Sequence, residues 1–382
     1  LITGSVGCQS TLTSIPPPSE ELWLPEQSFD GQLSDIPTTE DIFALSEHTK
    51  QQLRYITSTK SIMPERTKAV LNYIFKLADS GLIYQQSATT TAQETMLNGN
   101  ANCLSLAILT YSIAKEVGIE AVFQDVKIPE YWSSDTNQTW LNGHINVKLL
   151  QNRQLNHSSG LVLLGRDIVV DFDRNSITQH FATKTIKPKR VVAMFYNNKA
   201  AENFNRFNFA QTYRYYRSAI AADPDYAVTW SNLAVLYRHL ALYSLAEQVY
   251  HHSLALDPTS TNALSNLAVL YRYKGNIHAA RQLEQQVHEK RKNNPWYYVM
   301  LGNEAIKRNE LHAAIALFQQ ALALNNDTHE ALFGLARSHF ALNNTSKAAH
   351  YLEKAHRAAK LTADKQRYQH KISALNRLAS AG

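Results

Sequence analysis

The sequence predicts two folds in one chain, an α+β domain followed by an all-α array of helix pairs. Apolar residues recur at helical spacing between residues 38 and 118, and short β-branched runs follow up to residue 172. From residue 193 onward, one pattern returns every 34 residues. Helices followed by strands are typical of an α+β domain, and a fixed period of this length indicates a repeat array.

The first eight residues, LITGSVGC, end in small residues before Cys8. This stretch resembles the end of a bacterial lipoprotein signal sequence, although Ser5 stands where Leu is usual. The resemblance implies a lipidated Cys8, with Gln9 favouring the outer membrane and a protein that faces the periplasm. An incidental tail residue and a disulfide between Cys8 and Cys103 are the alternatives.

Residues 9–37 hold five of the eleven prolines and little apolar periodicity. This composition predicts a flexible tether. No apolar run reaches the roughly 18–20 residues that span a bilayer.

Residues 38–192 form the predicted α+β domain. A first helix is expected from Thr38 or Thr39, and a second follows Pro64. The helix that begins at Cys103 is apolar on all sides and ends at Gly118, so it is expected in the middle of a core. Runs at residues 120–126, 143–150 and 167–172 then predict an antiparallel meander.

Cys103 is the only cysteine of this domain, and it begins a helix after the turn-forming stretch NGNAN. A helix N-terminus favours the thiolate that acts as a nucleophile. His144 begins an alternating strand, and Asp171 and Asp173 end another. A base oriented by a carboxylate is the arrangement that activates such a thiol.

These residues, with TAQETMLNGNANC at 91–103 and Gly-His and Val-Val-Asp on successive strands, resemble the papain-related transglutaminase-like fold. The resemblance implies that Cys103 is the nucleophile, His144 the base and Asp171 the orienting carboxylate. The usual Asp-Pro is absent because Phe172 follows Asp171, so Asp173 is the alternative carboxylate.

Two neighbours of these residues carry weaker hypotheses. Asn102 or Trp140 could supply an oxyanion donor or line the cleft. A turn residue and a packed aromatic are the simpler interpretations, and we favour them.

The second half of the chain resembles the tetratricopeptide repeat, with five repeats that begin at residues 193, 227, 261, 295 and 329. The pattern requires small residues where helices meet, and Ala234, Ala268, Gly302 and Ala336 stand there. These residues are expected at the closest helix contacts of a superhelix spanning residues 193–362. Residues 363–382 form a polar-faced helix suited to cap the array.

Composition excludes several function classes. Residues 193–382 carry 22 Lys and Arg against 13 Asp and Glu, without a block of like charge. We interpret this excess as solvated helix faces. There is no glycine loop that would cradle a phosphate and no nucleic-acid motif. The fifteen histidines are dispersed, so neither a metal nor another cofactor is expected.

The sequence thus predicts a thiol-dependent acyl-transfer enzyme, more a cysteine protease or amidase than a cross-linking transglutaminase. Its substrate would be a polypeptide that the repeat groove recruits. The alternative is a non-catalytic scaffold of the cell envelope whose first domain only binds.

Overall fold

The structure is a computed structural model that describes residues 22–60, 62–79, 83–85, 88–134, 139–150, 167–172, 181–360 and 362–381. Its contacts divide the chain into two units. The first contains Leu1–Val126 and Ile145–Glu284, and the second contains Lys127–His144 and Gln285–Gly382. Strand β3 and helix α11 therefore each contribute residues to both units.

Five described α-helices precede the sheet, and those that start at Thr39 and Cys103 begin where the sequence predicts. They are α1 (Thr39–Phe43), α2 (Glu47–Thr57), α3 (Met63–Asp79), α4 (Ala92–Asn98) and α5 (Cys103–Glu116). Thr38 caps α1 in a capping box with Asp41. The single helix expected here is two helices, because the Ser46 side chain accepts a hydrogen bond from the Thr49 amide and starts a new one.

Helix α5 is the central helix of its unit, as its all-round apolar sequence predicts. Ten of its fourteen residues are buried, from Leu104 to Ala114. Its Tyr111 stacks on Phe123 of strand β3, with 4.4 Å between the ring centroids. Gly118 follows the helix with a φ of +72°, a conformation that glycine adopts without strain.

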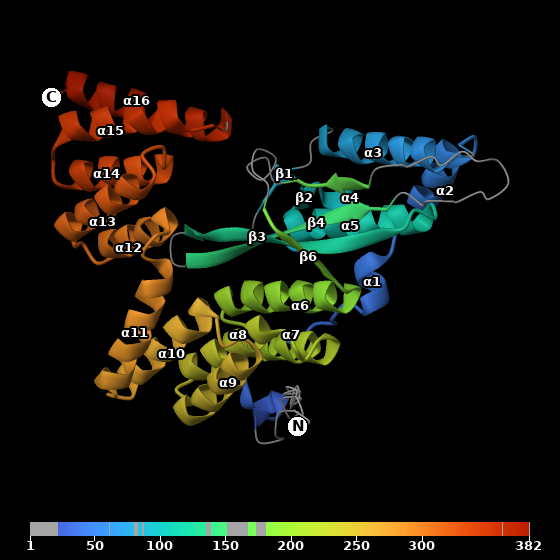
Figure 1. Ribbon diagram of the computed structural model, residues 1–382, viewed down its shortest axis with the longest axis horizontal. Coiled ribbons are helices and arrows are strands. Elements are labelled where there is room, and N and C mark those ends of the chain that lie inside the picture. The colour runs from blue at the N-terminus through green and yellow to red at the C-terminus, as the bar shows by residue number, and fades with distance from the viewer. Residues whose placement is uncertain are drawn as a thin grey trace, which may run out of the picture. The chain divides into compact units, whose positions relative to one another are not determined.

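A four-stranded sheet follows in the order β5-β4-β3-β6 (Figure 1). Its strands are β3 (Ala121–Ser134), β4 (Thr139–Leu149), β5 (Ile168–Val170) and β6 (Thr183–Ile186). The first three occupy meander order, as predicted, and β6 adds antiparallel to β3 through Phe123 and Ile186. The sequence did not indicate β6, which is four residues long and largely polar. A small parallel pair joins β1 (Ile83–Tyr84) to β2 (Asn100–Ala101).

Helix pairs fill the rest of the chain. They are α6 (Pro188–Asn205), α7 (Phe209–Ala222), α8 (Ala227–His239), α9 (Tyr243–Leu256), α10 (Thr261–Tyr273), α11 (Ile277–Arg291), α12 (Pro295–Lys307), α13 (Leu311–Leu324), α14 (His329–Ala341) and α15 (Thr345–Ala358), followed by α16 (Thr362–Ala381). Helices α8, α10, α12 and α14 begin at the predicted repeat starts. Helix α6 begins earlier, because Pro188 takes its first position, where the missing N–H costs nothing.

Small residues do allow close helix contacts. In the second unit, a β-carbon built on Gly302 would lie 2.6 Å from Cε1 of the fully buried Phe318. A β-carbon built on Gly334 would lie even closer to the same ring, at 2.3 Å from Cζ. The sequence predicted the contact at Gly302 and missed the one at Gly334.

The predicted tether differs from the structure. Residues 9–21 lie outside the described part of the chain, whereas residues 22–37 pack on α6, α7 and α8 of the first unit. Leu22 and Phe29 are buried there, and η2 (Glu26–Ser28) contacts α7. The physical reason is a set of partners 159 to 215 residues away in sequence, which local composition does not reveal.

Among the helices that the structure describes, none is both long and apolar enough to cross a bilayer.

Candidate active site

Cys103 is the first residue of α5, as the sequence predicts, and its thiol is free and partly buried. Asn102 precedes it in an extended conformation with φ −97° and ψ 179°. The thiol-bearing residue therefore stands in the first helical turn, where backbone N–H groups lack helical acceptors and the helix dipole is positive.

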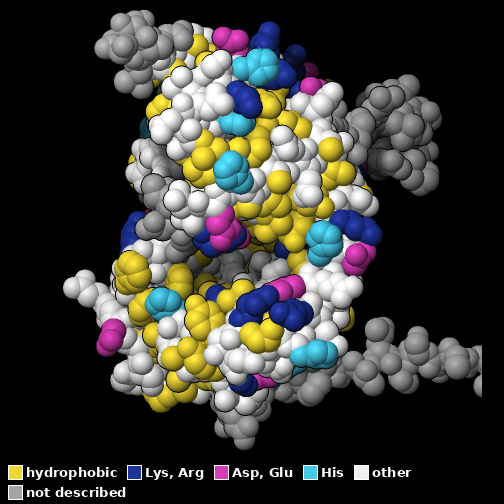
Figure 2. Space-filling model, turned by 90° about the vertical axis from the view of Figure 1, so that its left-hand side faces the viewer, with side chains coloured by type: hydrophobic (Ala, Val, Ile, Leu, Met, Phe, Trp, Pro, Cys, Tyr) yellow, Lys and Arg dark blue, Asp and Glu magenta, His cyan; other side chains and the backbone are white. Residues whose placement is uncertain are grey.

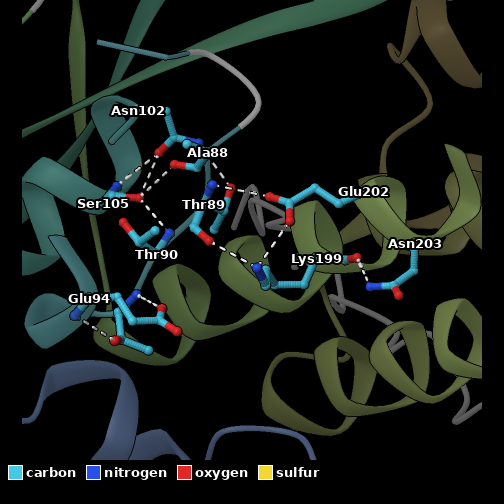
Figure 3. Close-up of polar contacts among 10 residues, drawn as sticks. Ala88, Thr89, Thr90, Glu94, Asn102, Ser105, Lys199, Glu202 and Asn203 are labelled. Carbon is cyan, nitrogen blue, oxygen red and sulfur yellow. Dashed lines mark hydrogen bonds and ion pairs between the residues drawn. The ribbon is translucent and has the colours of Figure 1, made fainter. Parts of the chain in front are cut away.

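The side chain of Asn102 fixes this helix start (Figure 3). Its Oδ1 accepts hydrogen bonds from the amide and the hydroxyl of Ser105, both at 3.0 Å. Its Nδ2 donates to Oγ1 of Thr89 at 2.9 Å. Both ends of the carboxamide are thus engaged, so Asn102 acts as the helix cap, the simpler of the two roles considered for it.

The segment from Ala88 to Thr90 lies against the same turn. Ser105, which is fully buried, shares its one hydroxyl proton between Oδ1 of Asn102 and the Ala88 carbonyl, the latter at 3.2 Å, and accepts from the Thr90 amide at 2.9 Å. The Asn102 amide donates to the same Ala88 carbonyl at 3.1 Å. These bonds join the residue before the cysteine to a chain segment that precedes it by more than ten residues.

Helix α6 holds that segment from the other side (Figure 3). Glu202 accepts a hydrogen bond from the Thr89 amide at 3.1 Å, and Lys199 donates to the Thr89 carbonyl at 3.1 Å. Lys199 and Glu202 also pair with each other at 3.0 Å. Helix α6 therefore positions the segment that contacts the turn of Cys103, which could not be detected from the sequence.

Asp171 lies directly after β5, opposite Asn146 of β4. The register pairs Val147 with Val170, so the next pair along the antiparallel ladder is Asn146 with Asp171. Nδ2 of the buried Asn146 donates to Oδ2 of Asp171 at 3.1 Å. Asp171 is thus oriented by its neighbour on β4, whereas Asp173 lies outside the described residues.

His144 lies on β4 and is buried, with 5% of its surface exposed. The preceding Gly143 leaves open space, since a β-carbon built there meets nothing within 4 Å. His144 belongs to the second unit, and Cys103 and Asp171 belong to the first. The convergence of the three side chains stays a prediction. The side chain of Trp140 lies outside what the structure describes.

Other site chemistry is sparse. Among the described residues, no group of three or more His, Cys, Asp or Glu side chains could hold a metal ion. Histidines on the face that Figure 2 draws form separate patches rather than one cluster.

Comparison with protein families concerns the second half of the chain. Models described as tetratricopeptide repeat match residues 229–262, 261–293 and 299–361. The C-terminal helices are tetratricopeptide repeats (TPRs). The matched TPR helices run from α8 to α15, in the register that the 34-residue period predicts.

Solved structures give only distant similarity. PilF of Pseudomonas aeruginosa is 17% identical, with a TM-score of 0.31, over 50% of this chain and 90% of that one. PilW, a type IV pilus biogenesis factor, is 20% identical with a TM-score of 0.31, and the match covers 50% of this chain and 88% of PilW. YrrB, a TPR protein with an unusual peptide-binding site, is 16% identical with a TM-score of 0.27, and the match covers 47% of this chain and 92% of YrrB. The comparison with curated proteins gives no significant match.

In the second unit, the TPR helices also hold the outer part of β3. Arg291 at the end of α11 forms two hydrogen bonds with the carboxylate of Glu130, at 2.6 and 3.0 Å. Its guanidinium lies 4.8 Å from the centre of the Trp132 ring. Asn294 donates to the Glu130 carbonyl at 2.6 Å. The strand that leads toward β4 is thereby fixed to a TPR junction.

Proposed function

We propose that the chain is a thiol-dependent acyl-transfer enzyme that acts on a polypeptide recruited by its TPRs. TPRs indicate a protein-interaction role, and this part of the assignment rests on the family matches. The catalytic part rests on Cys103 and on the transglutaminase-like pattern of the first domain.

The observation that carries the proposal is the position of Cys103. A free, partly buried cysteine begins a central helix, and buried hydrogen bonds from Asn102 and Ser105 fix its turn. A residue at such a position stands beside N–H groups without helical acceptors and at the positive end of the helix dipole. A cysteine that only filled the core would gain nothing from this placement.

In the proposed reaction, the sulfur of Cys103 attacks the carbonyl carbon of an amide. His144 takes the thiol proton and delivers it to the leaving amine as the C–N bond breaks, which leaves a thioester on Cys103. Asp171 would hold the imidazole in the required tautomer. Water then releases the acyl group as an acid, or an amine releases it as a new amide. We favour water, because bacterial proteins that share this resemblance are more often peptidases.

The TPRs would present the substrate. Lys199 and Glu202 of α6 bond to Thr89, which also bonds to Asn102, so one partly buried polar network links α6 to the residue before Cys103. This continuity favours a substrate that engages both parts of the chain.

A proteomic comparison tests the reaction. Cells that carry the wild-type chain or Cys103→Ala are compared for cleaved or cross-linked envelope proteins. We expect fragments that need Cys103. Identical protein populations, at equal levels of the two chains, would contradict the enzyme assignment.

The second candidate is a cell-envelope scaffold whose first domain binds without catalysis. The observation that favours it is that the matched family models all fall on TPRs, which act through binding. A scaffold would retain its partners after Cys103→Ala, and its thiol would react slowly whatever residue stands at position 144.

We also propose that lipidated Cys8 anchors the protein to the outer membrane, facing the periplasm. Cys8 lies outside the described residues, so the proposal rests on the lipoprotein-like pattern of residues 1–9. Two or more acyl chains provide stable anchoring. Fractionation of wild type against Cys8→Ser, with mass spectrometry of the mature N-terminus, tests this. An unmodified Cys8 in a soluble protein would end the proposal.

A further inference from the structure

Residues 22–37, here called the N-terminal segment, lie on α6, α7 and α8 in the manner of a bound peptide. The contacts that hold this segment are largely hydrogen bonds from repeat side chains to its main chain. Such contacts recognise an extended backbone without regard to most of its side chains.

Two buried tyrosines bind the first part of the segment. Oη of Tyr213 donates to the Leu24 carbonyl at 2.8 Å and accepts from the Leu24 amide at 2.9 Å. Oη of Tyr237 donates to the Leu22 carbonyl at 2.9 Å. Both rings are fully buried. One phenol thus satisfies both main-chain groups of Leu24.

A buried carboxamide binds the later part in the same way. Oε1 of Gln211 accepts from the Ser34 amide at 3.0 Å, and its Nε2 donates to the Ser34 carbonyl at 3.1 Å. Asn208 donates to the Gln32 carbonyl at 2.8 Å, and the Ala210 amide donates to the Asp30 carbonyl at 2.9 Å. The repeat surface therefore contacts the backbone along most of the segment.

Apolar side chains of the segment anchor it. Leu22 and Phe29 are buried, and the Phe29 ring stacks on Tyr213 with 4.2 Å between centroids. Leu33, by contrast, is 54% exposed. Trp23 also contacts the Trp230 ring, with 5.4 Å between centroids, and Leu24 and Ile36 pack against the same core.

Gly31 is a further position at which the surface of α6–α8 restricts the sequence that it can bind. Its φ is +136°, and a β-carbon there would lie 2.1 Å from Oδ1 of Asn208 and 3.2 Å from the Asn208 Cα. Any other residue would have a strained backbone and would collide with α7. The surface thus selects a bulky apolar residue, a second one seven positions later and a glycine two positions after that.

We infer that this face of α6–α8 is a peptide-binding site, which holds residues 22–37 as an exchangeable ligand of the same chain. The site would not stand empty, because Tyr213, Tyr237 and Gln211 would then lose the main-chain partners of their buried polar groups. A partner protein with an extended segment of the same pattern would bind by replacing the N-terminal segment. The inference does not depend on the chemistry of Cys103.

The test uses the full-length chain and a fluorescent peptide of residues 20–38. In the wild type, the attached segment competes at high effective concentration, so the peptide should bind weakly. Gly31→Ala in the chain should release the segment and strengthen binding of the unaltered peptide at least about tenfold. Leu33→Ala, at an exposed position, is the matched control and should leave binding as in the wild type. Anisotropy measures binding, and circular dichroism verifies that each chain is folded.

A second variant keeps the test decisive if Gly31→Ala fails to fold. Ser34→Pro removes the N–H that donates a hydrogen bond to Oε1 of Gln211, and it alters no buried side chain. In either folded variant, the Leu33→Ala peptide should bind and the Gly31→Ala peptide should not. Folded variants that bind no peptide, or a wild type that binds as tightly as they do, would overturn the inference. Cys103→Ser in all chains separates this result from the proposed reaction.

Discussion

Arg291 and Glu130 lie 161 residues apart in sequence and form an ion pair with two hydrogen bonds. The Arg291 side chain is only 5% exposed, whereas that of Glu130 is 31% exposed. The pair joins β3 to the end of α11 within the second unit. It is one of several contacts that join residues 127–144 to helices of the second unit, with ring contacts of Tyr131 and Trp132 among the others.

Removing the carboxylate of this pair should destabilise the second unit. Glu130→Ala leaves a buried guanidinium without its charged partner, and we expect a loss of about 3 kcal/mol in the free energy of unfolding. Glu310→Ala is the matched control, since the Arg308–Glu310 pair is exposed on both sides and should contribute little to stability. Urea unfolding of both variants measures the difference. Equal losses of unfolding free energy in the two variants would show that other contacts stabilise the Arg291 charge when Glu130 is absent.

Gly334 should not tolerate a β-carbon. The ring of Phe318 is fully buried and lies 2.3 Å from the position that this carbon would take, so Gly334→Ala forces the ring or α14 to move. Overpacking of this kind costs about 1–3 kcal/mol and outweighs the better helix propensity of alanine. Gly143→Ala, where nothing lies within 4 Å, should cost little. An unchanged urea midpoint for Gly334→Ala would contradict this packing.

The carboxyl group of Glu330 should make the stability of the folded chain depend on pH. Burial raises its pKa to about 7, and the nearby Asp364 carboxylate adds to the effect. The folded chain therefore favours the protonated carboxyl. The stabilisation is complete below the ordinary pKa of 4.5 and is lost as the pH rises through about 7.

Glu330→Gln isolates this effect, because the amide stays neutral at every pH. We expect a small difference from wild type at pH 5 and a variant more stable by roughly 1 kcal/mol at pH 8. The magnitude is modest because 35% of the side chain is exposed. His329 lies 3.3 Å from the Glu330 carboxylate, so its titration is coupled to this carboxyl, and burial lowers its pKa. A difference that does not change with pH would refute the assignment to Glu330.

The cap at Asn102 should affect both stability and the reactivity of Cys103. Asn102→Ala removes the acceptor for Ser105 and the donor to Thr89, at a cost of about 1–2 kcal/mol. Asn102→Asp retains the acceptor and should lose less stability. Thermal unfolding and thiol-labelling rates are measured together. A lower labelling rate in Asn102→Ala, with the fold retained, is the expected result, and an unchanged rate would show that the turn does not tune the thiol.

The repeat helices could be predicted because their signal is local and periodic. Small and aromatic residues return every 34 positions, so helix starts at residues 227, 261, 295 and 329 follow from spacing alone. The placement of residues 22–37 could not be predicted, because Tyr213 and Gln211 recognise main-chain groups, which every sequence possesses. The contact of Glu130 with Arg291 could not be predicted from the local sequence either.

The candidate site also combines features that the sequence predicts with features that it does not reveal. A cysteine after turn-forming residues and before an apolar run indicates a helix start, and Cys103 is found there. Its support by Lys199 and Glu202 depends on contacts across about 110 residues, with no sequence motif to mark them. The contact of Asn146 with Asp171 could not be predicted, because nothing in the alternating strand pattern marks Asn146 as facing a carboxylate.

The most direct test of the proposed chemistry is the rate at which a thiol-reactive probe labels Cys103 between pH 5 and 9. The comparison is made in a Cys8→Ser chain, which leaves Cys103 as its only thiol. The account predicts fast labelling at neutral pH that slows at least about tenfold in His144→Ala, while circular dichroism shows the fold retained. Slow labelling that rises only near the ordinary cysteine pKa of about 8.5, and is the same in both chains, would contradict it.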